Sequence, residues 1–113
     1  MGQGIASCLV ACGFSVVAFD QKAGQARAMM AHVDASLRDM LRRRLVPKSA
    51  LRNWRARLRS VATIEELAPC GFVIETVTED LPLKRRVHAD LERVLRPEAV
   101  IASNTSSFPI ALL

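Results

Sequence analysis

The chain has 113 residues, of which 50% are hydrophobic and 24% are charged, enough for one domain with a modest core. Its three cysteines are an odd number without a Cys-x-x-Cys pair, which argues against a disulfide framework and against a structural zinc site. The formal net charge is +5, and the basic residues are concentrated in one segment.

The opening segment carries no charge before Asp20. A secretory signal needs a positive n-region, and the first basic residue is Lys22. A membrane span needs about 20 apolar residues, and Gly13 interrupts this run. A myristoylation motif requires Ser or Thr where the chain has Ala6. We therefore expect a cytoplasmic protein without a membrane span or lipid anchor.

Small and apolar residues dominate positions 2–12 and predict a buried helix that starts near a glycine. Cys8 and Cys12 are four residues apart on this helix, and we expect both to pack in the core as small hydrophobic residues. Gly13 follows where a left-handed residue ends a helix, because glycine has no Cβ penalty at positive φ.

Residues 14–19 are rich in β-branched and aromatic side chains and predict a short buried strand that ends at Asp20. A helix, a tight turn and a strand closed by an acid form the second half of a dinucleotide-binding βαβ unit. In such a unit the acid binds the adenosine ribose, and the pyrophosphate rests on the helix N-terminus. The first strand and two glycines of G-x-G-x-x-G would be missing, and Gly2 would be the third glycine.

A basic segment covers residues 38–59, with nine Lys or Arg residues against one acid, Asp39. It is compatible with a nucleic-acid surface, a solvated helical face or a docking surface for a phosphorylated ligand. Trp54 is its only aromatic residue, and no nucleic-acid-binding motif surrounds it.

The remaining elements follow from periodicity and from helix start and stop signals. We expect a long amphipathic helix at about 23–45 broken at Val46-Pro47, a second basic helix through the fifties, a one-turn helix at 63–67 capped by Thr63, a buried strand at 72–77, a helix from Pro82 to about Leu95, and a strand at 99–103.

Four stretches together resemble the NAD-binding domain of the 3-hydroxyacyl-CoA dehydrogenase family: Met1-Gly2-x-Gly4-Ile5-Ala6, Asp20, VIETVTEDLPLK at 73–84, and IASNTSSFPI at 101–110. The resemblance extends over essentially the whole chain. It implies an α/β fold, a Rossmann-type parallel sheet with flanking helices, whose first strand is missing. Residues 1–113 would then be a partial NAD-binding Rossmann domain.

The resemblance implies four cofactor-binding positions in addition to the serine described below. Gly2 would lie under the pyrophosphate and Asp20 would hold the adenosine ribose, which favours NAD over NADP because an acid repels a 2′-phosphate. Glu79 and Lys84 would lie beside the nicotinamide ribose; otherwise they are an exposed charge pair. Glu75 lies inside an apolar strand, and we assign it no chemistry.

Ser106 matches the family serine that hydrogen-bonds the substrate 3-oxygen beside the nicotinamide, so it is the candidate catalytic and cofactor-adjacent residue. Asn104 would shape this loop. The loop follows the carboxyl end of a strand, where open α/β sheets bind ligands, although an ordinary Asn/Ser turn has the same composition.

Ser36 and Arg43 match positions where the family contacts coenzyme A. They are seven residues apart, two turns along one helix face. We therefore favour acyl-CoA over nucleic acid as the partner of the basic segment.

The family's catalytic histidine and its orienting glutamate would follow Leu113, and neither His32 nor His88 replaces that histidine. The helical C-terminal domain, which closes the substrate site and makes the homodimer, would also be absent, so we expect a fragment cut at both ends. The expected parent reaction is oxidation of L-3-hydroxyacyl-CoA to 3-oxoacyl-CoA in fatty-acid metabolism, with hydride passed to NAD. The alternatives are a nucleotide-binding-only module and a crystallin-like protein without catalysis. We expect the isolated chain to be inactive.

Overall fold

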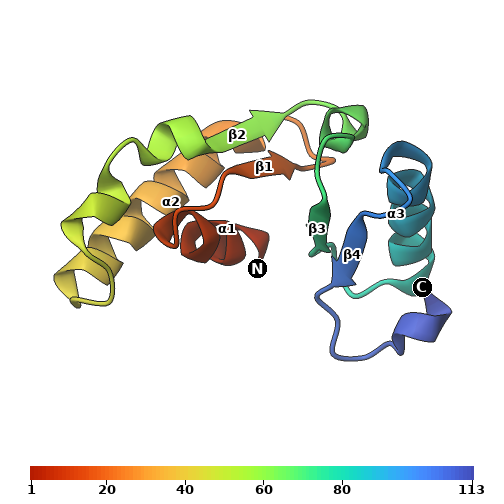
Figure 1. Ribbon diagram of the computed structural model, residues 1–113. Coiled ribbons are helices and arrows are strands. Elements are labelled where there is room, and N and C mark those ends of the chain that lie inside the picture. Colours follow the sequence, from red (N-terminus) through yellow and green to blue (C-terminus); the bar gives the residue numbers. More distant parts are fainter. The chain divides into compact units, whose positions relative to one another are not determined.

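The computed structural model describes residues 1–113, which divide into two compact units, Met1–Ala62 and Thr63–Leu113. Four strands form two separate two-stranded parallel sheets, one in each unit (Figure 1). Helices alternate with the strands along the chain, so the expected parallel α/β class is confirmed. No helix combines the length and the apolar character that crossing a membrane requires.

The first unit contains two helices and two paired strands. They are α1 (Gly2–Ala11), β1 (Val16–Phe19), α2 (Gln25–Arg42) and β2 (Leu58–Val61). Strands β1 and β2 run parallel, with Val16 opposite Leu58 and Phe19 opposite Val61. The expected strand at 14–19 is shorter, because Phe14 is 60% exposed and lies outside it, and β1 itself is half-buried.

The predicted left-handed turn after the first helix is confirmed at Gly13, whose φ is 91°. The Gly13 N–H donates to the Val10 carbonyl and the Phe14 N–H donates to the Leu9 carbonyl, both at 3.0 Å. This pair of bonds is a Schellman motif, which satisfies the last helical carbonyls and reverses the chain. The turn therefore sends β1 back along α1.

The core of the first unit lies between α1 and α2. Val10, Val33 and Leu37 have no exposed surface. The expectation that Cys8 and Cys12 are buried is wrong, because both are exposed. The helix turns about 100° per residue, so positions two residues beyond the buried Ala6 and Val10 face the opposite way.

The expected basic helix through the fifties is also wrong. The segment folds into two single 3-10 turns, Lys48–Leu51 and Trp54–Arg57, followed by strand β2. Only Leu58 and Val61 are buried in that strand, with two exposed residues between them. Pairing with β1 decides the conformation here, since the local sequence shows no alternation that would indicate a strand.

The second unit contains one helix packed on a two-stranded sheet. Its elements are a 3-10 turn at Ile64–Leu67, β3 (Phe72–Glu75), α3 (Leu81–Val94), β4 (Val100–Ser103) and a 3-10 turn at Ile110–Leu112. Strands β3 and β4 are parallel, and Glu75 lies opposite Ser103 at their carboxyl ends. The core consists of Leu67, Val87, Leu91 and Leu95.

Helix α3 begins as the sequence indicates. The Asp80 carboxylate accepts a hydrogen bond from the Leu83 N–H at 2.7 Å, and Pro82 occupies the first turn. An acceptor at the N-cap and a proline in the first turn both suit the free N–H groups of a helix start. The loop before α3 is thereby held at the carboxyl end of β3.

Candidate functional site

The first unit presents backbone donors at the start of α1, and α1 begins on the side towards which β1 runs (Figure 1). Met1 is the N-cap and its side chain makes no capping bond. Its carbonyl accepts from the N–H groups of Gly4 and Ile5, at 3.0 and 3.3 Å, whereas those of Gly2 and Gln3 have no acceptor. Free N–H groups at a helix N-terminus attract an anion, and they fit a pyrophosphate.

Asp20 follows β1 directly and is exposed. Its Oδ1 atom accepts a hydrogen bond from the Lys22 N–H at 2.8 Å, which leaves Oδ2 without a partner. A free carboxylate oxygen is a suitable acceptor for a ribose hydroxyl. The residues present in this unit therefore fit both the pyrophosphate and the ribose of a dinucleotide.

The serine loop, residues 104–107, follows β4 in the second unit. Its backbone is held by Glu79 from the loop before α3. The Oε1 atom of Glu79 accepts from the Thr105 hydroxyl at 2.6 Å, the Ser106 N–H at 2.9 Å and the Ser107 N–H at 3.2 Å. The Ser106 hydroxyl makes no hydrogen bond within the chain and its residue is exposed, so it is available to a ligand. Asn104 starts the loop by donating its N–H to the Glu75 carbonyl at 2.8 Å.

These donors lower the pKa of Glu79 to about 2 from the ordinary 4.5. The Thr105 hydroxyl has the largest effect, and the N–H groups of Ser106 and Ser107 and the Lys84 ammonium add to it. A carboxyl group with a lowered folded-state pKa stabilises the fold above its unfolded pKa, and the contribution disappears as the pH falls through the folded value. The loop contact is therefore complete near neutral pH.

We expect the amide resonances of Ser106 and Ser107 to titrate with a midpoint near pH 2, because protonation of Glu79 weakens the bonds that it accepts. An NMR titration between pH 6 and about 1.5 measures this midpoint. Glu79→Gln should abolish the transition. A midpoint near 4.5, the ordinary value for this side chain, would show that Glu79 does not hold the loop.

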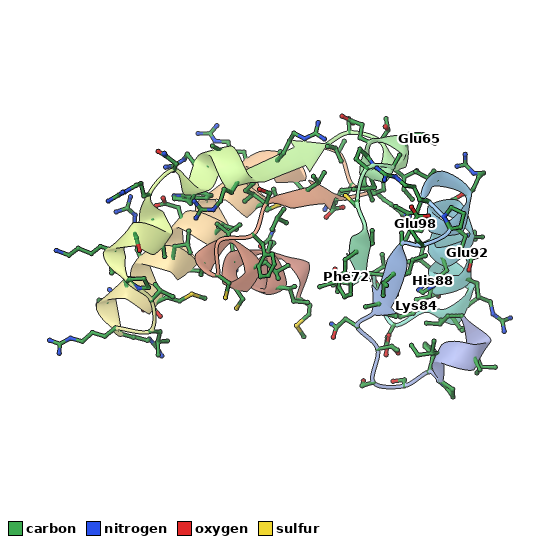
Figure 2. All side chains as sticks on the ribbon, viewed as in Figure 1. Glu65, Phe72, Lys84, His88, Glu92 and Glu98 are labelled. Atoms are coloured by element: carbon green, nitrogen blue, oxygen red, sulfur yellow. The ribbon has the colours of Figure 1, made fainter.

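Behind Glu79 lies a buried charge cluster. The Lys84 ammonium is completely buried and lies 3.1 Å from both oxygens of Glu75. Glu75 also accepts from the Val77 N–H and the Ser103 hydroxyl, both at 2.6 Å. Lys84 and His88 lie on successive turns of α3 (Figure 2), and His88 Nε2 is 3.5 Å from Glu75. The sequence analysis did not predict that Glu75 pairs with Lys84. The signal that could have indicated a buried partner was an acid inside an apolar strand.

Hydrogen bonding keeps the cluster ionised. Burial alone would raise the pKa of Glu75, but the bonds from Ser103 and Lys84 outweigh it and lower the pKa. Burial likewise opposes the charged form of Lys84, while the bonds to Glu75 and Glu79 raise its pKa. A buried charge persists only with such partners.

The structure places the two candidate coenzyme A residues around the end of α2. Ser36 is half-buried on the helix, and Arg43 is its exposed C-cap residue. The Arg43 guanidinium pairs with Asp39 at 2.8 Å, and Arg42 shares the same carboxylate. Three exposed cations of the basic segment have no acidic partner: Arg44, Lys48 and Arg52. Arg57, which is half-buried, donates only to backbone carbonyls. A positive surface thus remains after the local ion pairs are formed.

The parallel α/β topology, the free donors at α1 and the free acceptor on Asp20 define a dinucleotide-binding domain of the Rossmann type. The family described as "3-hydroxyacyl-CoA dehydrogenase, NAD binding domain" matches residues 1–113, and the chain belongs to this family. The cofactor of the domain is therefore NAD.

Similar proteins agree with this membership. The chain is 35% identical over 113 residues to a 3-hydroxybutyryl-CoA dehydrogenase of Bradyrhizobium diazoefficiens, covering 100% of the chain and 39% of the relative. It is 28% identical to a glyoxysomal fatty acid beta-oxidation multifunctional protein of Brassica napus, covering 97% of the chain and 15% of the relative. The crystal structure of (S)-3-hydroxybutyryl-CoA dehydrogenase from Ralstonia eutropha matches with a TM-score of 0.87 and 28% identity, covering 97% of the chain and 39% of that structure.

Proposed function

We propose that the chain is the nucleotide-binding part of an enzyme that oxidises L-3-hydroxyacyl-CoA to 3-oxoacyl-CoA, with hydride transferred to NAD. The family match over residues 1–113 carries this proposal. It is supported by Ser106, whose backbone is fixed by Glu79 while its hydroxyl stays free for a substrate oxygen.

Each candidate cofactor-binding residue has a physical role in this proposal. The N–H groups at the start of α1, including that of Gly2, bind the pyrophosphate, and Asp20 accepts from the adenosine ribose. Glu79 Oε2 contacts only Lys84, at 3.2 Å, so it can accept one further bond from the nicotinamide ribose. Lys84 supports the cofactor site from behind Glu79. NAD, when bound, supplies the hydride acceptor.

The Ser106 hydroxyl would donate a hydrogen bond to the oxygen on C3 of the substrate. This bond becomes stronger in the transition state, because the oxygen gains negative charge while the hydroxyl proton leaves for the base and the hydride leaves C3. Asn104 positions the loop through its backbone bond to Glu75 at 2.8 Å.

The activity is proposed for the full-length protein, because the chain spans 39% of the length of the Bradyrhizobium relative. We propose that residues 1–113 form a partial domain and do not turn over substrate alone. His88 is buried against Glu75, and His32 is an exposed residue of α2, so we assign neither as the base that takes the hydroxyl proton. That base, and a helical domain that forms the homodimer, would lie outside these residues.

The location proposed for the enzyme is the cytoplasm. All three cysteines are free thiols, including the exposed Cys8 and Cys12, and free exposed thiols are typical of a reducing compartment.

NADH formation from L-3-hydroxybutyryl-CoA and NAD by the full-length protein tests the proposed reaction. Turnover supports the dehydrogenase. Tight NAD binding without turnover would instead identify a nucleotide-binding-only module, and failure to bind NAD would favour a crystallin-like structural protein.

The role of the basic segment is tested by Arg43→Ala. We expect KM for acyl-CoA to rise about two- to fivefold with kcat nearly unchanged, because an exposed charge contact contributes up to about 1 kcal/mol of uniform binding. The effect should shrink at high salt. Arg86→Ala on α3, another exposed arginine, is the matched control and should leave KM unchanged. Retained acyl-CoA affinity with lost nucleic-acid binding would assign the segment to nucleic acid.

A further inference from the structure

Lys84 uses all its donors inside the protein. Its ammonium group contacts the Glu75 carboxylate, Glu79 Oε2 at 3.2 Å and the Val77 carbonyl at 3.4 Å. An ammonium group has three N–H donors, and all three are directed to these partners. The side chain has no exposed surface, so it has no direct path to a ligand. Of these partners, Glu79 is the one whose side chain accepts hydrogen bonds from Thr105, Ser106 and Ser107.

Glu79 in turn connects the cluster to the serine loop. One of its oxygens faces Lys84, and the other accepts from Thr105 and from the N–H groups of Ser106 and Ser107. The orientation of this carboxylate therefore depends on where Lys84 holds Oε2. Glu79 is about one-third exposed, whereas Glu75 is fully buried at its side chain. Water therefore does not weaken the ion pair between Lys84 and Glu75, whereas it can weaken the pair between Lys84 and Glu79.

We propose that Glu75 is a positioning residue for the reaction: it anchors Lys84, which aligns Glu79 and thereby sets the position of Ser106. The contacts run from Glu75 on β3 through Lys84 on α3 to the loop after β4. A buried carboxylate, Glu75, thereby controls the position of the exposed Ser106 hydroxyl. The inference rests on the proposed function of Ser106 as the group that contacts the substrate oxygen.

The charges of the cluster explain why Glu75 has this effect. Two carboxylates share one ammonium, so Lys84 is held between Glu75 and Glu79 rather than paired with either alone. Without the charge on Glu75, the buried ammonium keeps only the partly exposed Glu79 as an ionic partner. Lys84 then moves towards Glu79, and the oxygen that holds the Ser106 and Ser107 amides changes its orientation.

A double-mutant cycle between Glu75 and Ser106 tests the proposal in the full-length protein. Glu75→Gln keeps the size of the side chain and removes its charge, and we expect kcat to fall about tenfold with KM for acyl-CoA unchanged. In a Ser106→Ala background the same substitution should change kcat less than about twofold, because residues acting through one another are not additive. Asp90→Asn, an exposed change on the same helix, is the matched control.

A purely structural role would give a different result, since a general loss of order would lower kcat by the same factor in both backgrounds. That additive result would overturn the proposal. If Glu75→Gln does not fold, Ser103→Ala takes its place in the cycle. It removes only one donor to Glu75, so we expect the same coupling to Ser106 at a smaller magnitude.

A second measurement, which does not require turnover, tests this inference separately from the proposed function. Should the wild-type protein prove inactive, the Ser106 and Ser107 amides still report the alignment by NMR. Glu75→Gln should shift both resonances and speed their hydrogen exchange about tenfold relative to Asp90→Asn. Unchanged amides would overturn the positioning role, whatever reaction the protein catalyses.

Discussion

Ser106→Ala is expected to lower kcat for 3-hydroxyacyl-CoA oxidation about 100- to 1000-fold, the range found when one hydrogen-bond donor to a developing oxyanion is removed. The Ser106 hydroxyl makes no bond within the chain, so its loss leaves no internal group unpaired. Its backbone N–H, which Glu79 holds at 2.9 Å, is unaffected by the substitution. We therefore expect the melting temperature to remain unchanged while turnover falls.

Ser107→Ala is the matched control for this prediction. Its N–H also donates to Glu79, at 3.2 Å, but the resemblance assigns its hydroxyl no contact with substrate. Steady-state kinetics of both variants should separate them by about 100- to 1000-fold in kcat. Equal activity of the two variants would remove Ser106 from the reaction.

Asp20→Ser is expected to weaken NAD binding about ten- to a hundredfold, because losing a charge-assisted hydrogen bond costs about 1.5–3 kcal/mol. The Oδ1 atom of Asp20 already accepts from Lys22, so the ribose contact depends on the remaining oxygen. Removing the carboxylate also removes its repulsion of a 2′-phosphate, so discrimination against NADP should relax. Calorimetric titration with both nucleotides measures the two effects.

Asp20→Asn separates charge from hydrogen bonding. It keeps one oxygen as the acceptor for the Lys22 N–H and places an amide NH2 donor where Oδ2 was. A ribose hydroxyl can accept from that donor, so Asp20→Asn should lose less NAD affinity than Asp20→Ser while still relaxing the discrimination against NADP. Unchanged NAD affinity in Asp20→Ser would show that this residue does not hold the ribose.

The sequence predicted the elements whose signals are local. Gly13 indicated a left-handed helix end, and the structure has φ of 91° there. Pro82 indicated the start of α3, which begins at Leu81 with Asp80 as its N-cap. Strands β3 and β4 were expected from their apolar runs, and each proved shorter or shifted by one or two residues.

Strand β2 was missed because its signal is not local. Leu58 and Val61 are its only buried residues, and they lie beside an arginine-rich stretch that reads as a helix face. The parallel partner, β1, is about 40 positions earlier in the chain. The burial of Cys8 and Cys12 was likewise wrong because an apolar helix does not reveal which face meets the core.

In the candidate site, too, the sequence predicted residues that lie in local motifs but not the contacts that depend on distant partners. The motif resemblance named Glu79, Lys84 and Ser106, and the structure joins Glu79 to both of the others, at 3.2 Å to Lys84 and 2.9 Å to the Ser106 N–H. The sequence did not show that Glu75 anchors Lys84, because the two come from different elements and meet only after the helix packs on the sheet. Spacing alone cannot distinguish an exposed ion pair from one without any exposed surface.

A crystal structure of the full-length protein with NAD and a 3-oxoacyl-CoA is the most direct test of the proposed ligand contacts. We expect the adenosine ribose hydroxyls on Asp20, the pyrophosphate at the Gly2 end of α1, and the 3-oxygen of the acyl group within hydrogen-bonding distance of the Ser106 hydroxyl. NAD bound away from Asp20, or an acyl oxygen held by other residues with the Ser106 hydroxyl turned to solvent, would contradict the proposed function.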